Sequence, residues 1–288
     1  MKSVARQLRA GHAFSRMGIR WGIPALVVAL AGCAGNKPVV PAVTPSAGST
    51  ASAGSASSGA QSEADVQRRA RIRLELAASY FQANRNDVAL EEVAQALAAN
   101  PNYADAYALL GLIYMRNQDL EQAENSLRKA LSLSPQDPDL LHNYGWLQCQ
   151  RGQFEQAQQS LDNALAQPGY RDRPKTLMAK GLCMQQAGQL EAAQQALTTA
   201  YEMDPSSGVI GYHLSNVLLQ RGDARRAQFY IRRLNNSPQS NAESLWLGIK
   251  VERALQESAA MRQLAQQLHK RFPESRQWLA YERGAFNE

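Results

Sequence analysis

The chain is poor in the residues that build catalytic and metal sites. Its four histidines, His12, His142, His213 and His269, are scattered without paired metal-ligand spacing. It has no phosphate-binding loop, no nucleophile elbow and no zinc-protease helix motif. We therefore expect a protein that is not an enzyme, with no metal, no cofactor and no small-molecule substrate.

Long apolar runs are also missing. The run Trp21–Leu30 is well short of the roughly 20 residues that a membrane-spanning helix needs. It follows a basic stretch and precedes Leu30-Ala31-Gly32-Cys33, the layout of a secretory signal peptide ending in a sequence that resembles the bacterial lipobox. We expect a lipoprotein signal peptide over 1–32 and lipidation of Cys33; the alternative is an ordinary signal peptide cleaved elsewhere.

The position after Cys33 bears on localisation. It is Ala34 rather than Asp, which under the sorting rule for Gram-negative lipoproteins predicts lipid anchoring to the periplasmic face of the outer membrane. Several acyl chains would make that anchoring effectively permanent.

A basic surface is not evident in the remainder of the chain. The formal net charge is +6, but residues 1–32 carry five cations and no acid, so the rest carries only +1. This balance argues against a nucleic-acid partner. The short pairs Arg225-Arg226 and Arg232-Arg233 are interpreted as solvated helix surface.

Aromatic residues and most charges are absent just after Cys33. Residues 33–62 are dominated by Ala, Gly, Ser, Thr, Pro and Val, a composition that buries too little apolar surface to fold. We expect a flexible tether there, before a folded domain over 63–283 and a tail over 284–288.

The folded domain is a repeat array. Leu76-Ala77, Tyr80, Ala89 and Pro101 recur thirty-four residues later as Leu110-Gly111, Tyr114, Ala123 and Pro135. This is the tetratricopeptide pattern of two antiparallel helices per unit, so we expect an all-α superhelix. Carrying the pattern forward, with two extra residues near Pro168, gives units near 70–103, 104–137, 138–173, 174–207, 208–240 and 241–274.

Small residues and glycines support this assignment. Gly111, Gly145 and Gly181 lie inside first helices, where close helix approach must compensate for glycine's low helix propensity. Gly152 and Gly188 are expected in the turns within units.

The first helices of such an array line a concave groove. By resemblance to other tetratricopeptide proteins, its exposed positions should bind a partner peptide or helix. Met115 and Trp146 are the foremost candidates. The alternative is that some of these side chains pack between repeats and complete the core. The predicted groove residues are Leu74, Phe81, Ala108, Leu112, Met115, His142, Trp146, Met178, Leu182, Tyr212 and Leu219.

Two further cysteines, Cys149 and Cys183, lie on first helices of adjacent units. In an oxidising compartment they could form a disulfide. The alternative is a pair of buried, reduced thiols, because a bridge needs Cα atoms within roughly 7 Å and a sequence does not give that distance.

Several segments together resemble one family. They are the lipobox cysteine, the tether, His142–Leu147, Pro168–Tyr170, Gly181–Cys183, Asn241–Lys250 and Phe272–Ser275. The chain resembles the type IV pilus biogenesis and stability lipoproteins, the PilF/PilW family. That resemblance implies an outer-membrane pilotin that binds the secretin subunit and promotes its multimerisation. The alternative is a periplasmic adaptor that regulates a peptidoglycan synthase or protease.

Overall fold

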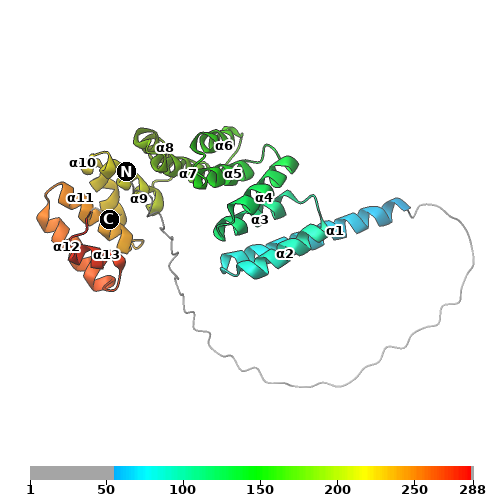
Figure 1. Cartoon of the computed structure of the whole chain (residues 1–288), viewed down its shortest axis with the longest axis horizontal. Helices are drawn as coiled ribbons and strands as arrows, with labels where there is room; N and C mark the ends of the chain where they lie inside the picture. The colour runs from blue at the N-terminus through cyan, green and yellow to red at the C-terminus, as the bar shows by residue number, and fades with distance from the viewer. Residues whose placement is uncertain (1–54, 287–288) are drawn as a thin grey trace, which may run out of the picture. The chain divides into compact units, whose positions relative to one another are not determined.

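The computed structural model describes residues 55–286, and this part of the chain consists of helices without a strand (Figure 1). The predicted signal peptide, Cys33 and most of the predicted tether lie outside the described residues. The helices are α1 (Ser55–Gln82), α2 (Asn86–Ala99), α3 (Ala104–Arg116), α4 (Leu120–Leu133), α5 (Pro138–Gln150), α6 (Phe154–Ala166), α7 (Arg173–Gln186), α8 (Leu190–Met203), α9 (Gly208–Gln220), α10 (Ala224–Asn235), α11 (Ala242–Ala254), α12 (Ser258–Arg271) and α13 (Arg276–Glu282).

The first twelve helices form six consecutive pairs, from α1–α2 to α11–α12. Each first helix contacts the first helix of the next pair, whereas the second helices of different pairs do not contact one another. The first helices therefore form an inner layer and the second helices an outer one. This is the tetratricopeptide superhelix that the repeat pattern predicts.

Glycines set the distance between the two helices of a pair. A Cβ on Gly111, Gly145 or Gly181 would lie only 2.6–2.8 Å from Cγ of the leucine sixteen residues later. A side chain at these positions would collide with the second helix. The close approach expected from the sequence is confirmed.

The turn inside each pair uses a left-handed residue at one fixed place. Gly152, Gly188 and Gly222 have φ of +74°, +77° and +82°. In the second repeat the same place is held by Gln118, at φ +64°. Asn84 and Gln256 fill it in the first and sixth repeats. The glycine turns expected from the sequence are confirmed, and half of the repeats form the same turn without glycine.

The first helix is longer than the sequence boundary predicts. It begins at Ser55, inside the segment expected to be tether. Adding residues to an existing helix costs much less than nucleating one, and this stretch contains no proline. The strongly helical residues after Ser62 can therefore extend the helix toward the N-terminus.

The last repeat is closed by α13 and the residues after it. This short helix packs against α11 and α12. Phe286 stacks on Trp246 with ring centroids 5.3 Å apart, and the guanidinium of Arg253 lies 4.1 Å from the centre of the Phe286 ring. The end of the core is thus covered by aromatic residues. In the described part of the chain, every helix is too short or too polar to cross a membrane.

Candidate functional site

The candidate binding surface is the set of groove residues predicted on the first helices, which we call the first-helix face. The structure places them on α1, α3, α5, α7 and α9. Most are half-buried, which leaves part of each side chain accessible. These half-buried residues are Leu74, Phe81, Ala108, Leu112, Trp146, Met178, Leu182, Tyr212 and Leu219.

Met115 is an exception to the prediction. Its exposed fraction is 6%, and it packs in a core cluster with Ala123, Leu127 and Leu147. An unbranched, flexible thioether fills the irregular space between the second and third repeats. The expectation that Met115 is an exposed anchor is therefore wrong.

Trp146 belongs to both the core and the surface. It is half-buried. It packs against the core cluster that contains Met115 and against the larger core cluster that contains Cys149 and Cys183. Its side chain therefore contacts two core clusters. Some of its surface remains for a partner, and the rest completes the core.

Phe81 is partly covered by a cation. The guanidinium of Arg116 lies 3.4 Å from the centre of the Phe81 ring and donates a hydrogen bond to the Phe81 carbonyl. Arg116 also donates a hydrogen bond to Oδ1 of Asn84 at 3.3 Å. Burial lowers the pKa of Arg116 from its ordinary value. A partner on this part of the face would meet a guanidinium as well as apolar side chains.

His142 is the second exception. Its exposed fraction is 6%, and Nδ1 is hydrogen-bonded to Oγ1 of Thr176 at 2.8 Å. The pKa of His142 is lowered to about 4, mainly by burial and less by the charge of Lys175, while Asp172 opposes the shift. The imidazole is therefore neutral near pH 7. It links α5 to α7, and the prediction of an exposed His142 is wrong.

Two residues of this network were not among the predicted site residues. The Tyr170 hydroxyl lies 2.7 Å from Oγ1 of Thr176, and both residues are buried. Tyr170 lies in the loop between α6 and α7 that holds the two extra residues, next to Gly169, whose φ is +74°. The insertion was the available signal, because it brings a tyrosine over the hydrogen-bonded pair of helices.

The same two helices are joined by a disulfide between Cys149 and Cys183, whose Cα atoms are 5.6 Å apart. This separation lies within the range that a bridge requires. Both cysteines are almost completely buried. The middle of the first-helix face is therefore held by two cross-links between α5 and α7.

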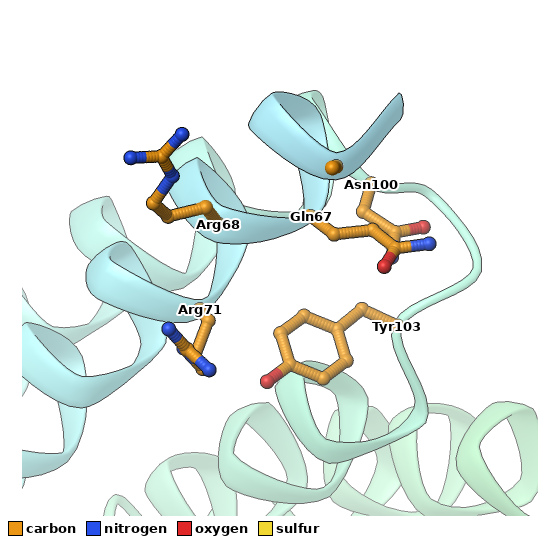
Figure 2. A pocket seen from close by; sticks show the side chains of 6 residues that line it. Gln67, Arg68, Arg71, Asn100 and Tyr103 are labelled. Atoms are coloured by element: carbon orange, nitrogen blue, oxygen red, sulfur yellow. The ribbon is translucent and has the colours of Figure 1, made fainter. Parts of the chain in front are cut away.

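A shallow pocket of about 420 Å³ lies between α1 and the loop that joins α2 to α3 (Figure 2). Figure 2 shows Tyr103 and Arg71 on the same side of it, with the Arg68 guanidinium turned away. Arg68 pairs with Asp65, and Arg71 lies 3.8 Å from Glu75. Because both cations have acidic neighbours, we do not take this pocket as the functional site.

The described residues contain no group of three or more His, Cys, Asp or Glu side chains placed to hold a metal ion. The chemistry of the first-helix face is instead that of a protein contact: apolar side chains, aromatic rings and a few polar groups.

Family models and solved structures identify the repeat. Two models described as tetratricopeptide repeat match the chain, one over residues 74–138 and the other over 114–181 and 184–246. Together they cover more than half of the sequence. No curated protein sequence matches the chain.

Two solved structures resemble about three quarters of the chain. One is PilW, described as a widely conserved type IV pilus biogenesis factor, with 26% identity and a TM-score of 0.69 over 74% of this chain and 97% of that chain. The other is PilF of Pseudomonas aeruginosa, with 21% identity and a TM-score of 0.67 over 76% and 99% of the two chains, a likeness of fold.

A third structure matches less closely. YrrB, a tetratricopeptide protein with an unusual peptide-binding site, has 14% identity and a TM-score of 0.52 over 66% of this chain and 97% of that chain. Repeat pattern, helix pairing and these matches agree. The chain belongs to the tetratricopeptide repeat family, and its fold is similar to that of the type IV pilus biogenesis factor PilW and to that of PilF.

Proposed function

We propose that the chain is an outer-membrane lipoprotein scaffold for type IV pilus biogenesis. As a pilotin, it binds the secretin subunit and promotes its localisation and multimerisation in the outer membrane. The observation that carries the proposal is the match to PilW, which extends over 97% of that chain at 26% identity.

The anchor in this proposal is Cys33. The lipobox-like sequence before it supports lipidation, and Ala34 supports retention at the outer membrane. In this proposal the repeat array lies in the periplasm, next to the membrane in which the secretin ring assembles.

Binding is assigned to the first-helix face. Leu112 on α3 and Met178 and Leu182 on α7 are half-buried apolar residues of this face. An apolar segment of the secretin subunit would cover them and gain the free energy of burying that surface. Tethering then raises the effective concentration of subunits at the membrane, so assembly is promoted without a catalytic step.

The first experiment is genetic. In a deletion strain we expect loss of secretin multimers on gels and loss of twitching motility, with both restored by the wild-type chain. A Cys33→Ala chain should restore neither. Normal outer-membrane multimers with Cys33→Ala would contradict the anchoring step.

A second experiment tests the face itself. Leu182 lies on this face and belongs to none of the core clusters, so Leu182→Arg should leave the array folded and weaken secretin binding at least tenfold. Met203→Arg is the matched control, because Met203 is 48% exposed on the second helix of the same repeat. Equal secretin recovery by both variants in pull-downs would place the binding surface elsewhere.

The same pull-down tests the alternative partner. Recovery of a peptidoglycan synthase or protease, with secretin multimers intact in the deletion strain, would favour a cell-wall adaptor. The fold would then serve a different assembly.

A further inference from the structure

The outer helices divide the array into two electrostatic halves. The second helices of the first four repeats are acidic or neutral, with formal charges of −3 on α2, 0 on α4, −2 on α6 and −2 on α8. In contrast, α10 carries +4 and α12 carries +3, and neither contains an acidic residue. The net charge after residue 32 is near zero, but the outer helices of the last two repeats are basic.

An exposed aromatic residue lies in the middle of this basic region. Phe229 on α10 has an exposed fraction of 62%, the largest among the exposed large apolar side chains of the described residues. The repeat itself does not require an aromatic residue there. The corresponding residues of the four preceding repeats are all polar and exposed: Glu91, Asn125, Gln159 and Gln195.

Phe229 lies between two arginines on one stripe of the helix. Arg225 and Arg233 are four residues before and after it, so all three side chains lie on one face. That face is opposite the buried residues Ala227 and Ile231. We call the stripe Arg225–Phe229–Arg233 the α10 face.

The two arginines of the α10 face are not engaged within the array. The neighbouring Arg226 pairs with Asp223 at 3.5 Å, and Arg232 pairs with Glu252 at 2.7 Å. Arg225 and Arg233 have no acidic partner within 4.0 Å among the residues that the structure describes. Their charge is thus available to an external anion.

The location of α10 in the outer layer indicates which kind of anionic partner the α10 face can bind. The helix contacts only α9 and α11, so its outer side belongs to the outer layer of the superhelix. Peptides are usually recognised in grooves or at sheet edges, whereas a projecting aromatic ring flanked by cations suits a flat, soft and negatively charged surface. Phospholipid phosphates attract arginine, and an aromatic ring enters the headgroup region.

We propose that the α10 face docks on the surface of a bilayer that contains anionic phospholipid. This contact is separate from the binding surface on the first helices, and it does not depend on whether the chain assembles secretin. It gives the array a second attachment, far along the chain from the N-terminal segment. It also orients the first-helix face away from the bilayer.

The test measures vesicle binding by the unlipidated chain from Ala34 onward. This form keeps the whole described array and removes the apolar run Trp21–Leu30, which would bind lipid by itself. We expect it to sediment with vesicles of equimolar phosphatidylcholine and phosphatidylglycerol but not with phosphatidylcholine alone. Binding should weaken as salt rises.

Three variants identify the surface. The double change Arg225→Ala and Arg233→Ala should lower the partition coefficient by about 10–30-fold, since each cation contributes roughly fivefold near an anionic membrane. Phe229→Ser should lower it at least threefold, and Phe229→Trp should preserve it. Thermal unfolding verifies that these exposed substitutions leave the array folded.

The matched control is Arg128→Ala with Lys129→Ala. It removes the same charge from exposed positions on another second helix, α4. We expect little change in its vesicle binding. An equal loss in control and α10 variants, or no binding of the wild-type chain to anionic vesicles, would overturn the proposal. Binding to soluble polyglutamate but not to vesicles would also overturn it and assign the face to an acidic protein.

Discussion

Cys149 and Cys183 lie on the first helices of consecutive repeats, thirty-four residues apart, and their disulfide joins α5 to α7. Seven residues before each cysteine, His142 and Thr176 make a second link between the same helices. The two links lie two helical turns apart along the same pair of helices. The junction between the third and fourth repeats is therefore the most strongly cross-linked part of the array.

Removing the disulfide should destabilise the array. Cys149→Ala with Cys183→Ala releases a loop of about 34 residues, which on the chain-entropy model costs about 3–4 kcal/mol. Urea unfolding measures the change, and reduced wild-type protein is the control, because it should approach the stability of the double variant. Equal stability of oxidised and reduced wild type would contradict this prediction.

Stability should depend on His142 in a defined pH window. The pKa of His142 is about 4 in the folded chain, below its ordinary value of 6.5, so the unfolded chain binds the proton more readily. The stabilising contribution is complete above about pH 6.5 and is lost as pH falls toward 4, by about 3 kcal/mol. Urea unfolding of the wild type and of His142→Gln at several pH values measures it. The variant should show a shallower dependence over this window, and parallel curves would count against the assignment.

The pair Arg232–Glu252 should respond asymmetrically to substitution. The Glu252 side chain is only 1% exposed and accepts hydrogen bonds from Arg232 at 2.7 and 2.9 Å and from Gln228 at 2.8 Å, while the Arg232 side chain is 50% exposed. Arg232→Met leaves a buried carboxylate without its cation and should cost about 3 kcal/mol. Glu252→Gln leaves an arginine that water can solvate and should cost less. Chemical unfolding of both variants gives the comparison, and the reverse order would show that the carboxylate is solvated.

Two substitutions test the repeat geometry in opposite directions. Gln118→Gly relieves a left-handed backbone at φ +64° and should stabilise the array by about 0.5–1 kcal/mol. Gly145→Ala places a Cβ 2.8 Å from Cγ of Leu161 and should destabilise it by about 1–2 kcal/mol, despite alanine's better helix propensity. Thermal or urea unfolding gives both values. Stabilisation by Gly145→Ala would mean that Leu161 can move aside.

The repeat pattern was sufficient to predict the fold, because each unit has small, apolar and turn-forming residues at the same positions. Glycines opposite leucines recur in successive repeats, and so do prolines after second helices. A helix that is misassigned in one repeat can therefore be corrected by comparison with the next repeat. The fate of single side chains was less predictable. Met115 and His142 hold expected groove positions, yet Met115 fills a gap between repeats and His142 bonds to Thr176. Both contacts depend on how neighbouring repeats pack, which periodicity does not encode.

The pairing of charged side chains was also not predictable from the sequence. The sequence predicts ordinary surface for Arg225-Arg226 and Arg232-Arg233, because it does not show which arginines lie against an acidic side chain. The structure places two of these arginines against acids and leaves two beside an exposed Phe229. The distinction follows from which acidic side chains the fold brings within reach of each arginine.

The disulfide also has a mechanical consequence. If the array is pulled from its two ends, repeats outside the link can unravel, but the residues between Cys149 and Cys183 cannot extend while the bond holds. At about 3.3–3.6 Å per residue, the disulfide prevents the release of roughly 110–120 Å of contour length. A force-extension trace should therefore be shorter by this length than that of the reduced protein, so the bridge sets how far the array can stretch under load.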